Sequence, residues 1–197
     1  MYKEYLYRRI PNYLENDNTV YEPYSIPKNL FRIWDSTSRK YCGGWNLDQF
    51  TDTLKLTREN LPGWKEIVIR NENIDSFLKN EFGPDHPVTR AFYLLNYGVM
   101  QADFLRVLYV YKYGGLYLDM KSYVDGPLPE IPPGKALWIG TWPLHKEIIG
   151  GDGEIQNWFI YGRKGAPILK TVIERIIHNI FSLHETSTLH NFLNTQT

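Results

Sequence analysis

The segment Ala102–Lys121, which reads ADFLRVLYVYKYGGLYLDMK, constrains the fold of this chain more than any other. An apolar helix carries Asp103 and Arg106 one turn apart, ends at the glycine pair 114–115, and leads into a short apolar strand. That strand stops at Asp119, where a buried strand would meet solvent. A carboxylate at such a place has an unfavourable desolvation energy unless it interacts with a cation, a hydroxyl group or a metal. The segment therefore predicts a ligand-binding edge of an α/β sheet.

Apolar runs of strand length alternate with runs of helical spacing over most of the chain. This alternation predicts an α/β fold, with a mostly parallel sheet flanked by helices on both faces. Asn46 is the expected N-cap of the first helix. We expect strands at 26–34, 64–70, 116–118, 136–140 and 158–161, and helices at 46–60, 73–82, 88–97, 101–113 and 167–181.

The chain has 197 residues, which is enough for one domain with a substantial core. Residues 1–25 are rich in tyrosine and charge and predict a lead-in made of a helix followed by extended chain. Residues 26–197 contain no repeat, no low-complexity tract and no flexible linker. They are expected to form the single domain.

Charge and cysteine content exclude several classes of partner. The 22 basic and 22 acidic side chains balance, so no global field would attract nucleic acid or an anionic membrane surface. Cys42 is the only cysteine, which excludes an internal disulfide and is typical of a reducing compartment. No apolar run approaches the roughly 20 residues of a membrane span, and the N-terminal residues lack a secretory apolar core. We therefore expect a cytoplasmic protein with no membrane segment in this chain.

Several common catalytic motifs are absent from the sequence. It contains neither a GxxxxGK[ST] phosphate loop nor a GxGxxG turn, and it has no GxSxG nucleophile elbow. The histidines near the C-terminus do not have HExxH spacing, and one cysteine cannot build a structural zinc site. The remaining chemistry must use carboxylates, an arginine, aromatic faces and a metal where one is bound.

The order of several motifs resembles a known family of sugar transferases. The motifs are the strand 26–34, the ADxxR helix, the sequence YGGLYLD, the triplet Asn157-Trp158-Phe159 and the turn 164–167. Together they are similar to the retaining glycosyltransferases that carry a DXD motif. This group contains yeast-type α-1,6-mannosyltransferases and capsular polysaccharide transferases and, more distantly, the glucosylating clostridial toxins. The resemblance covers residues 26–181 and implies a fold of the GT-A type, in which a Rossmann-like nucleotide half is merged with an acceptor half.

The resemblance also implies roles for individual residues. Ile33 and Trp34, at the end of the first strand, would contact the nucleotide base, although Trp34 fits a core position equally well. Asp103 and Arg106 share one helix face and would bind the hydroxyl groups of the donor sugar, unless they form only a structural ion pair. Asn157 would lie near the donor sugar and the reacting centre. These roles imply a UDP- or GDP-sugar donor and a glycan acceptor.

One glycine and two acidic loop residues complete the expected site. Gly115, which allows a sharp turn after the helix, would let the backbone approach the donor, although a glycine pair is also an ordinary helix end. Asp152 and Glu154 lie in a glycine-rich loop and are candidates for acceptor binding or metal ligation, or simply form a solvated acidic loop. Members of the family usually continue beyond the point where this chain ends, so the resemblance implies that part of the site is either missing from this chain or supplied by a longer parent sequence.

Asp119 corresponds to the first acid of the DXD motif, which in the family contacts the ribose and metal-bound water. The second acid is replaced by Lys121. That second carboxylate usually holds the Mn²⁺ or Mg²⁺ that neutralises the leaving diphosphate. Either the Lys121 ammonium takes over this charge, or a metal is held by Asp119 with other oxygens such as those of Ser122 and Asp125, or activity is lost. Because an ammonium repels a divalent ion, we expect reduced metal dependence.

The expected function is the transfer of a sugar from a nucleotide-diphosphate sugar to an acceptor hydroxyl, in polysaccharide or glycoprotein glycan synthesis, with retention of anomeric configuration. The alternative is a degenerate transferase that only binds a nucleotide sugar or carbohydrate. The missing second acid favours this alternative more than an intact DXD motif would.

Overall fold

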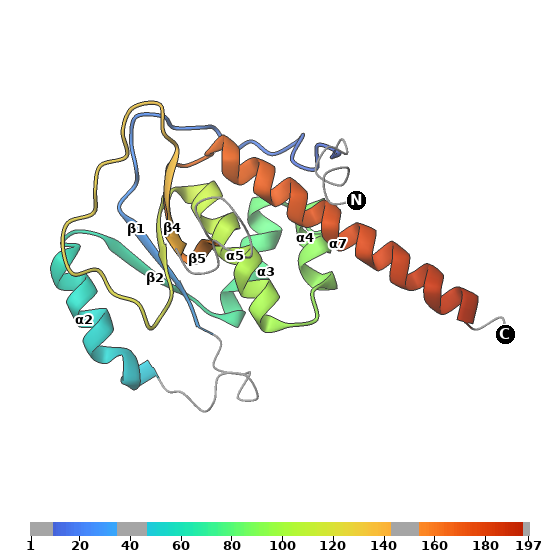
Figure 1. The fold of residues 1–197 in the computed structure, drawn as a ribbon, viewed down its shortest axis with the longest axis horizontal. Helices are drawn as coiled ribbons and strands as arrows, with labels where there is room; N and C mark the ends of the chain where they lie inside the picture. The colour runs from blue at the N-terminus through green and yellow to red at the C-terminus, as the bar shows by residue number, and fades with distance from the viewer. Residues whose placement is uncertain (1–9, 35–46, 143–153, 195–197) are drawn as a thin grey trace.

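The computed structural model describes residues 10–34, 47–142 and 154–194, and at their centre lies a five-stranded sheet (Figure 1). The strands lie side by side in the order β2-β1-β3-β5-β4. Their bounds are Asn29–Ile33 for β1, Lys65–Ile69 for β2, Gly115–Leu118 for β3, Leu137–Trp142 for β4 and Glu154–Gly162 for β5.

The direction of the strands confirms the mostly parallel sheet. β1 runs parallel to β2 and β3, whereas β5 pairs antiparallel with both β3 and β4, so that only β5 runs against the other strands. Phe31 of β1 lies opposite Tyr117 of β3, which places the C-terminal ends of both strands at one edge. We call this the carboxyl edge of the sheet. In open α/β sheets ligands bind beyond this edge.

Helices cover both faces of the sheet, as the alternating pattern predicts. In Figure 1, α2 lies on one side of β1 and β2, and α3, α4, α5 and α7 lie on the other. The helix bounds are Leu47–Phe50 for the 3-10 helix η1, Thr51–Asn60 for α2, Asn71–Glu81 for α3, Pro87–Leu94 for α4, Gly98–Tyr113 for α5 and Pro167–Asn194 for α7. The α/β class, with a mostly parallel sheet flanked by helices, is therefore confirmed.

Alternating strand residues supply two separate apolar cores. Phe31 and Tyr117 point to one face and pack with residues of α3, α4, α5 and α7. Their neighbours Leu30 and Leu116 point to the other face and pack with Leu61, which follows α2. A strand directs successive side chains to opposite faces, so a sheet covered on both sides needs apolar residues at nearly every position. This is why these strands are continuous apolar runs.

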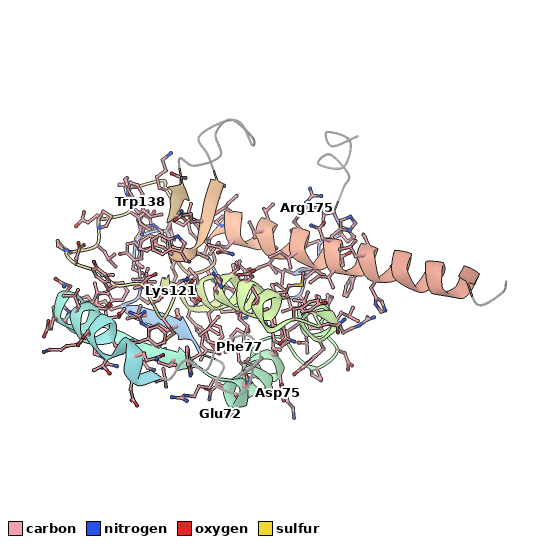
Figure 2. All side chains as sticks on the ribbon, turned by 60° about the horizontal axis from the view of Figure 1, so that its bottom comes forward. Glu72, Asp75, Phe77, Lys121, Trp138 and Arg175 are labelled. Atoms are coloured by element: carbon pink, nitrogen blue, oxygen red, sulfur yellow. The ribbon has the colours of Figure 1, made fainter. Side chains whose placement is uncertain are left out.

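The helix α3 is held against α5 by aromatic stacking. The ring of Phe77 on α3 stacks on that of Tyr109 on α5, with 4.0 Å between the ring centroids. Figure 2 shows Phe77 directed towards α5, whereas Glu72 and Asp75 lie on the outer side of α3. This contact fixes α5, the helix that carries the DxxR motif, relative to β1 and β2.

Residues 10–25 contain no helix and run along the domain as extended chain with a turn at residues 13–16. The carboxylate of Asp17 pairs with Lys112 of α5 at 2.8 Å and accepts a hydrogen bond from the Tyr111 hydroxyl at 2.8 Å. Burial alone would raise the pKa of Asp17, but hydrogen bonds from Lys112, Tyr111 and Thr19 outweigh it and lower that pKa. Residues 1–9 lie outside the described residues, so the lead-in helix stays a prediction.

The expected elements all occur, but several boundaries differ. The helix expected over 88–97 ends at Leu94, because Leu95 adopts an extended backbone that separates α4 from α5. β5 begins at Glu154 rather than at 158, because its first residues pair with the end of β4. The local sequence pattern does not predict this long-range pairing. α7 continues past the expected end at 181. Asn46 and Asp152 lie outside the described residues, and so does the side chain of Glu154.

Among the described helices, none is long and apolar enough to cross a membrane.

Candidate active site at the carboxyl edge of the sheet

Arg106, on α5, is the centre of a polar cluster at the carboxyl edge. Its side chain is only 8% exposed, and its Nη2 pairs with Asp103 Oδ1 at 2.9 Å. Its Nη1 donates to both the backbone carbonyl and the side-chain Oδ1 of Asn157, each at 3.0 Å. One planar guanidinium therefore joins α5 to β5. An arginine offers five N–H donors in fixed directions and is suited to such bridging.

Asn157 also bonds to the acid on α5, which closes a ring of three side chains. Its Nδ2 donates to Asp103 Oδ1 at 3.0 Å. Asp103 and Arg106 lie three residues apart on one helix face, as the spacing predicts. Asn157, however, is 54 positions away in sequence from Asp103 and reaches it only because β5 lies beside β3.

Asp119 joins the same cluster from the end of β3. Its Oδ1 lies 3.6 Å from Arg106 Nη1 and accepts a hydrogen bond of 2.7 Å from the Tyr117 hydroxyl. The Arg106 guanidinium lies over the Tyr117 ring, 4.8 Å from its centroid. The four residues expected to be catalytic, Asp103, Arg106, Asn157 and Asp119, therefore meet in one place. Their catalytic role itself stays a prediction.

Among the described residues, each carboxylate of the cluster makes its contacts through one oxygen only. Asp103 and Asp119 both employ Oδ1, and the Oδ2 atom of each has no hydrogen-bond donor among the described residues. The two side chains are 44% and 26% exposed. Two ionised oxygens held in place by a buried cation and open to solvent can accept hydrogen bonds from the hydroxyl groups of a ligand.

The electrostatics of the cluster keep Tyr117 protonated and make Asp103 less acidic. Burial, aided by the Asp119 charge, raises the pKa of the Tyr117 phenol far above its usual value, although Arg106 opposes the shift. Tyr117 therefore remains a donor to Asp119. Burial also raises the pKa of Asp103. The Arg106 charge and the Asn157 hydrogen bond oppose this shift, and the charge of Asp119 reinforces it.

Ile33 and Trp34 lie at the same edge, on the neighbouring strand β1. The Trp34 ring is 8% exposed and packs edge-on against Phe50 of η1, with 5.4 Å between ring centroids. It shares an apolar cluster with Met120. Trp34 thus fills a core position, and its expected contact with a nucleotide base stays a prediction.

Gly115 does not lie with the other expected site residues. It opens β3, and Asp119 lies four positions further along, about 13 Å away in extended chain. Its φ of +112° is a conformation that favours glycine, and a Cβ there would lie 2.3 Å from the carbonyl oxygen of Asn29. The glycine is therefore required by the close approach of β1 and β3, and its position does not support the expected contact with the donor.

We expect Gly115→Ala to lower the free energy of unfolding by about 3 kcal/mol, because the methyl group would force β1 and β3 apart and strain the backbone. Gly134→Ala is the matched control, since Gly134 also has a positive φ of 78°, but a methyl group there would meet nothing within 4 Å. That control is expected to cost about 1 kcal/mol. Urea unfolding of the two variants gives the comparison, and equal losses would contradict the steric explanation.

Lys121 is exposed and lies in the turn that follows β3 (Figure 2). The Ser122 amide donates to the Asp119 carbonyl at 3.0 Å, so residues 119–122 form a β-turn with Lys121 at its third position. Within the described residues, the Lys121 ammonium has no ion-pair or hydrogen-bond partner. A cation that no acid neutralises, close to Asp119, is available to an anionic ligand.

The described part of the chain does not fit a divalent metal at this edge. It contains no group of three His, Cys, Asp or Glu side chains that could hold a metal ion. Asp103 and Asp119 are both committed through Oδ1 to Arg106, and an ammonium stands where the family has a second acid. Mn²⁺ and Mg²⁺ need several oxygen ligands, and a neighbouring cation repels them.

A polar pocket lies at the other end of α5, away from the Asp119 cluster. It has a volume of about 590 Å³ and is lined by the lead-in around Asp17, the end of α3, and Lys112 and Tyr113 of α5. Its charged groups are largely paired with each other, because Lys112 bonds to Asp17 at 2.8 Å and the Tyr113 hydroxyl to Glu81 at 2.6 Å. This pocket is separate from the Asp119 cluster and presents no comparable open carboxylates.

Two residues that support the site do not follow from the sequence motifs. The sequence favours sheet packing for Tyr117, yet its hydroxyl also donates a hydrogen bond to Asp119. Residues two apart in extended chain point to the same face of a sheet, so the spacing of Tyr117 and Asp119 is a signal that could have predicted this bond. Arg32 lies within the predicted strand 26–34 but has no role predicted for it, although a charged residue in the apolar run LFRIW is a clear anomaly.

Comparison with known proteins agrees with this arrangement. Residues 47–138 match the family model of the glycosyltransferase sugar-binding region containing the DXD motif. This range includes the DxxR helix and the turn at Asp119.

Curated relatives are mannosyltransferases of fungi. The initiation-specific α-1,6-mannosyltransferase of Saccharomyces cerevisiae is 32% identical over 118 residues, which are 59% of this chain and 24% of that protein. The corresponding protein of Candida albicans is 20% identical, over 85% of this chain and 47% of that protein. Inositol phosphoceramide mannosyltransferase 1 of Schizosaccharomyces pombe is 22% identical, over 82% and 47%. This chain therefore spans between a quarter and a half of the length of these relatives.

A solved structure named PaToxG glycosyltransferase has the same fold, with a TM-score of 0.52 at 16% identity, over 89% of this chain and 75% of the other. The sequence and fold comparisons thus relate this chain to the glycosyltransferases with a DXD sugar-binding region, and they confirm the resemblance seen in its motifs.

Proposed function

We propose that this protein is a glycosyltransferase that moves a sugar from a nucleotide-diphosphate sugar to an acceptor hydroxyl with retention of anomeric configuration. The observation that supports it best is the meeting of Asp103, Arg106, Asn157 and Asp119 at the carboxyl edge of the sheet. Two partly exposed carboxylates, both paired with one buried arginine, suit a ligand that is rich in hydroxyl groups.

In this proposal the cluster binds the donor through its open oxygens. Asp103 Oδ2 accepts from hydroxyl groups of the donor sugar, and Asp119 Oδ2 accepts from the ribose. Arg106 holds both carboxylates in position, and Asn157 orients Asp103 through its amide. Ile33 and Trp34, at the end of β1, lie beside the base. Because these groups are held by the fold before the donor binds, little ordering is needed on binding.

The leaving diphosphate is neutralised by side-chain cations in this proposal. Lys121 is exposed beyond β3 and has no acidic partner in the described residues, so its ammonium is free to contact the diphosphate. Fixed positive charge directed at a leaving group stabilises the transition state of transfer. We therefore propose that Lys121 supplies the charge that the second DXD acid would otherwise recruit through a metal, and that transfer depends little on added Mn²⁺ or Mg²⁺.

The transfer step follows from these contacts. The acceptor oxygen forms a bond to the anomeric carbon while the bond from that carbon to the diphosphate oxygen breaks. The proton of the acceptor hydroxyl passes to the departing diphosphate oxygen on the same face of the sugar. Attack on the face from which the diphosphate leaves retains the configuration.

The sugar to test first is mannose, because three relatives are named mannosyltransferases. No residue in the described site distinguishes mannose from other hexoses. GDP-mannose and a panel of UDP-hexoses are therefore the appropriate donors, with simple mannosides and glucosides as acceptors.

A second candidate function is a binding module without transfer activity. The observation that favours it is the lysine at position 121, which breaks the DXD motif. Such a module would bind a nucleotide sugar and leave it intact. Slow hydrolysis of the bound donor by water would exclude it, since glycosyltransferases commonly hydrolyse their donors when no acceptor is present.

Asp119→Asn tests the proposed function. The amide keeps an acceptor oxygen but loses the charge that pairs with Arg106, so we expect kcat/KM for the donor to fall about 10- to 100-fold. Release of nucleoside diphosphate from each donor measures turnover, and titration calorimetry measures donor affinity.

The matched control for this test is Asp75→Asn on α3. Asp75, like Asp119, accepts a hydrogen bond from a tyrosine hydroxyl, that of Tyr93, but it lies on the outer side of α3 (Figure 2). We expect this variant to retain full turnover. Equal activity of Asp119→Asn and the unsubstituted protein would remove Asp119 from the mechanism.

A further inference from the structure

Arg32, in the middle of β1, is a completely buried cation beneath the proposed donor site. Its exposed fraction is 0%, and it lies on the face of the sheet that α2 covers. Charged side chains are almost never fully buried unless their donors are paired. Burial lowers the pKa of Arg32, although its partner Glu66 opposes the shift.

Arg32 holds both ends of the turn that carries Asp119 and Lys121. Its Nη1 donates to the backbone carbonyl of Asp119 at 2.7 Å and to that of Ser122 at 3.0 Å. These two carbonyls belong to the first and fourth residues of the turn. One nitrogen atom therefore spans the turn from below and fixes its two ends relative to β1.

The other donors of Arg32 are tied to the elements around it. Its Nε pairs with Glu66 of β2 at 3.2 Å, and its Nη2 donates to the Thr57 hydroxyl of α2 at 3.1 Å. Glu66 in turn pairs with Arg58 at the end of α2. Thr57 is itself fully buried and donates to a helix carbonyl. The guanidinium thus has a fixed position, and the turn is bonded to a fixed group.

We infer that Arg32 is a positioning residue for sugar transfer: it clamps the Asp119–Ser122 turn and thereby sets where the Asp119 carboxylate and the Lys121 ammonium lie. This inference rests on the proposed function. A positioning error of about 1 Å can cost about 100-fold in rate, so a group that holds the turn affects catalysis without touching the donor.

The clamp also bears on the metal question. A turn whose ends are bonded to a buried arginine does not need a bound ion to hold its shape. Its conformation should therefore be the same with and without divalent metal. This consequence can be measured without any assay of activity.

Arg32→Lys is the test. Lysine keeps the charge, but its single ammonium cannot bond to two turn carbonyls, Glu66 and Thr57 at once. We expect faster amide hydrogen exchange in the peptide that covers residues 119–124. We also expect the donor KM to rise at least fivefold and kcat per folded molecule to fall about tenfold, with the acceptor KM unchanged.

Arg163→Lys is the matched control. Arg163 is also buried, and it donates to two backbone carbonyls, those of Lys135 at 3.1 Å and Ile131 at 2.8 Å, in a loop away from Asp119. It should lose stability in the same way, so apparent kcat falls only with the folded fraction and the donor KM does not change. A purely structural role of Arg32 would give this same result.

If Arg32→Lys does not fold, Thr57→Val supplies the measurement, because it removes one acceptor of the guanidinium and keeps the volume of the side chain. The Thr57 hydroxyl also accepts from the Val124 amide at 3.4 Å, so exchange in this variant is read over residues 119–123. Faster exchange over these residues with a raised donor KM supports the clamp. Unchanged exchange there, or an unchanged donor KM, overturns it. Exchange that responds to EDTA or Mn²⁺ in the unsubstituted protein also overturns it. Failure of the proposed function would be visible separately, as absent turnover in the unsubstituted protein.

Discussion

Arg106→Met is expected to lower kcat/KM for donor turnover about 1000-fold, which corresponds to about 4 kcal/mol of transition-state stabilisation. The arginine is the shared partner of Asp103, Asn157 and Asp119, so its loss removes the one cation that pairs with both acids. Neutral donors alone then remain, the Asn157 amide for Asp103 and the Tyr117 hydroxyl for Asp119. Removing one member of a buried charge cluster leaves the others without compensation. Because both carboxylates are partly exposed, the stability cost should be smaller, about 2 kcal/mol.

A double variant separates the catalytic effect of Arg106 from its structural effect. Asp103→Asn combined with Arg106→Met removes one of the two stranded negative charges and should recover about half of the lost stability. Donor turnover should not recover, because the open carboxylate on α5 is then also absent. Urea unfolding and nucleoside diphosphate release are measured on all members of the cycle. Turnover that returns together with stability would show that Arg106 acts only as a structural ion pair.

Lys121→Met is expected to lower donor turnover about 100-fold, the size of effect seen when one group that stabilises developing charge is removed. The side chain is exposed and makes no ion pair within the described residues, so the free energy of unfolding should change by less than about 0.5 kcal/mol. Lys65→Met is the matched control, because Lys65 is also an exposed lysine but opens β2 at the opposite edge of the sheet. This control should retain full turnover.

Lys121→Asp directly tests whether the Lys121 ammonium replaces a metal ion held by a second acid. It places an acid two residues after Asp119, as in a DXD motif, and should reduce turnover in EDTA at least as much as Lys121→Met. Added Mn²⁺ should then restore part of the activity, because two carboxylates can share a divalent ion. For the unsubstituted protein we expect EDTA and Mn²⁺ to change turnover less than twofold. A complete and restorable metal requirement in the unsubstituted protein would contradict the role given to Lys121.

Much of the site could be predicted because its residues have local signals. Asp103 and Arg106 lie three apart on a helix, and Asp119 ends an apolar strand; both features follow from helix and strand periods alone. The fold class follows from the alternation of these periods. The resemblance to the DXD transferases extends the prediction to Asn157, which no local pattern would have linked to Asp103.

The differences between the expectations and the structure share one physical cause, which is that long-range pairing has no local signature. Gly115 is expected beside the donor, but the approach of Asn29 across the sheet explains the glycine instead. The last strand is expected to be short, but pairing with β4 extends β5. Arg32 has no predicted role because the turn carbonyls that it bonds are 87 and 90 positions away in the chain.

The amino-acid sequence by itself determined the order of strands and helices, the glycine-pair junction and the placement of an acid at the end of β3, since each depends on residues close together in the chain. Only the tertiary structure decided that one buried guanidinium, that of Arg106, serves two acids and an amide, and that another, that of Arg32, supports the turn from the opposite face. The strand order β2-β1-β3-β5-β4 brings these groups together. Distances between residues that are far apart in sequence are set by packing of the whole sheet, and no stretch of the chain carries that information alone.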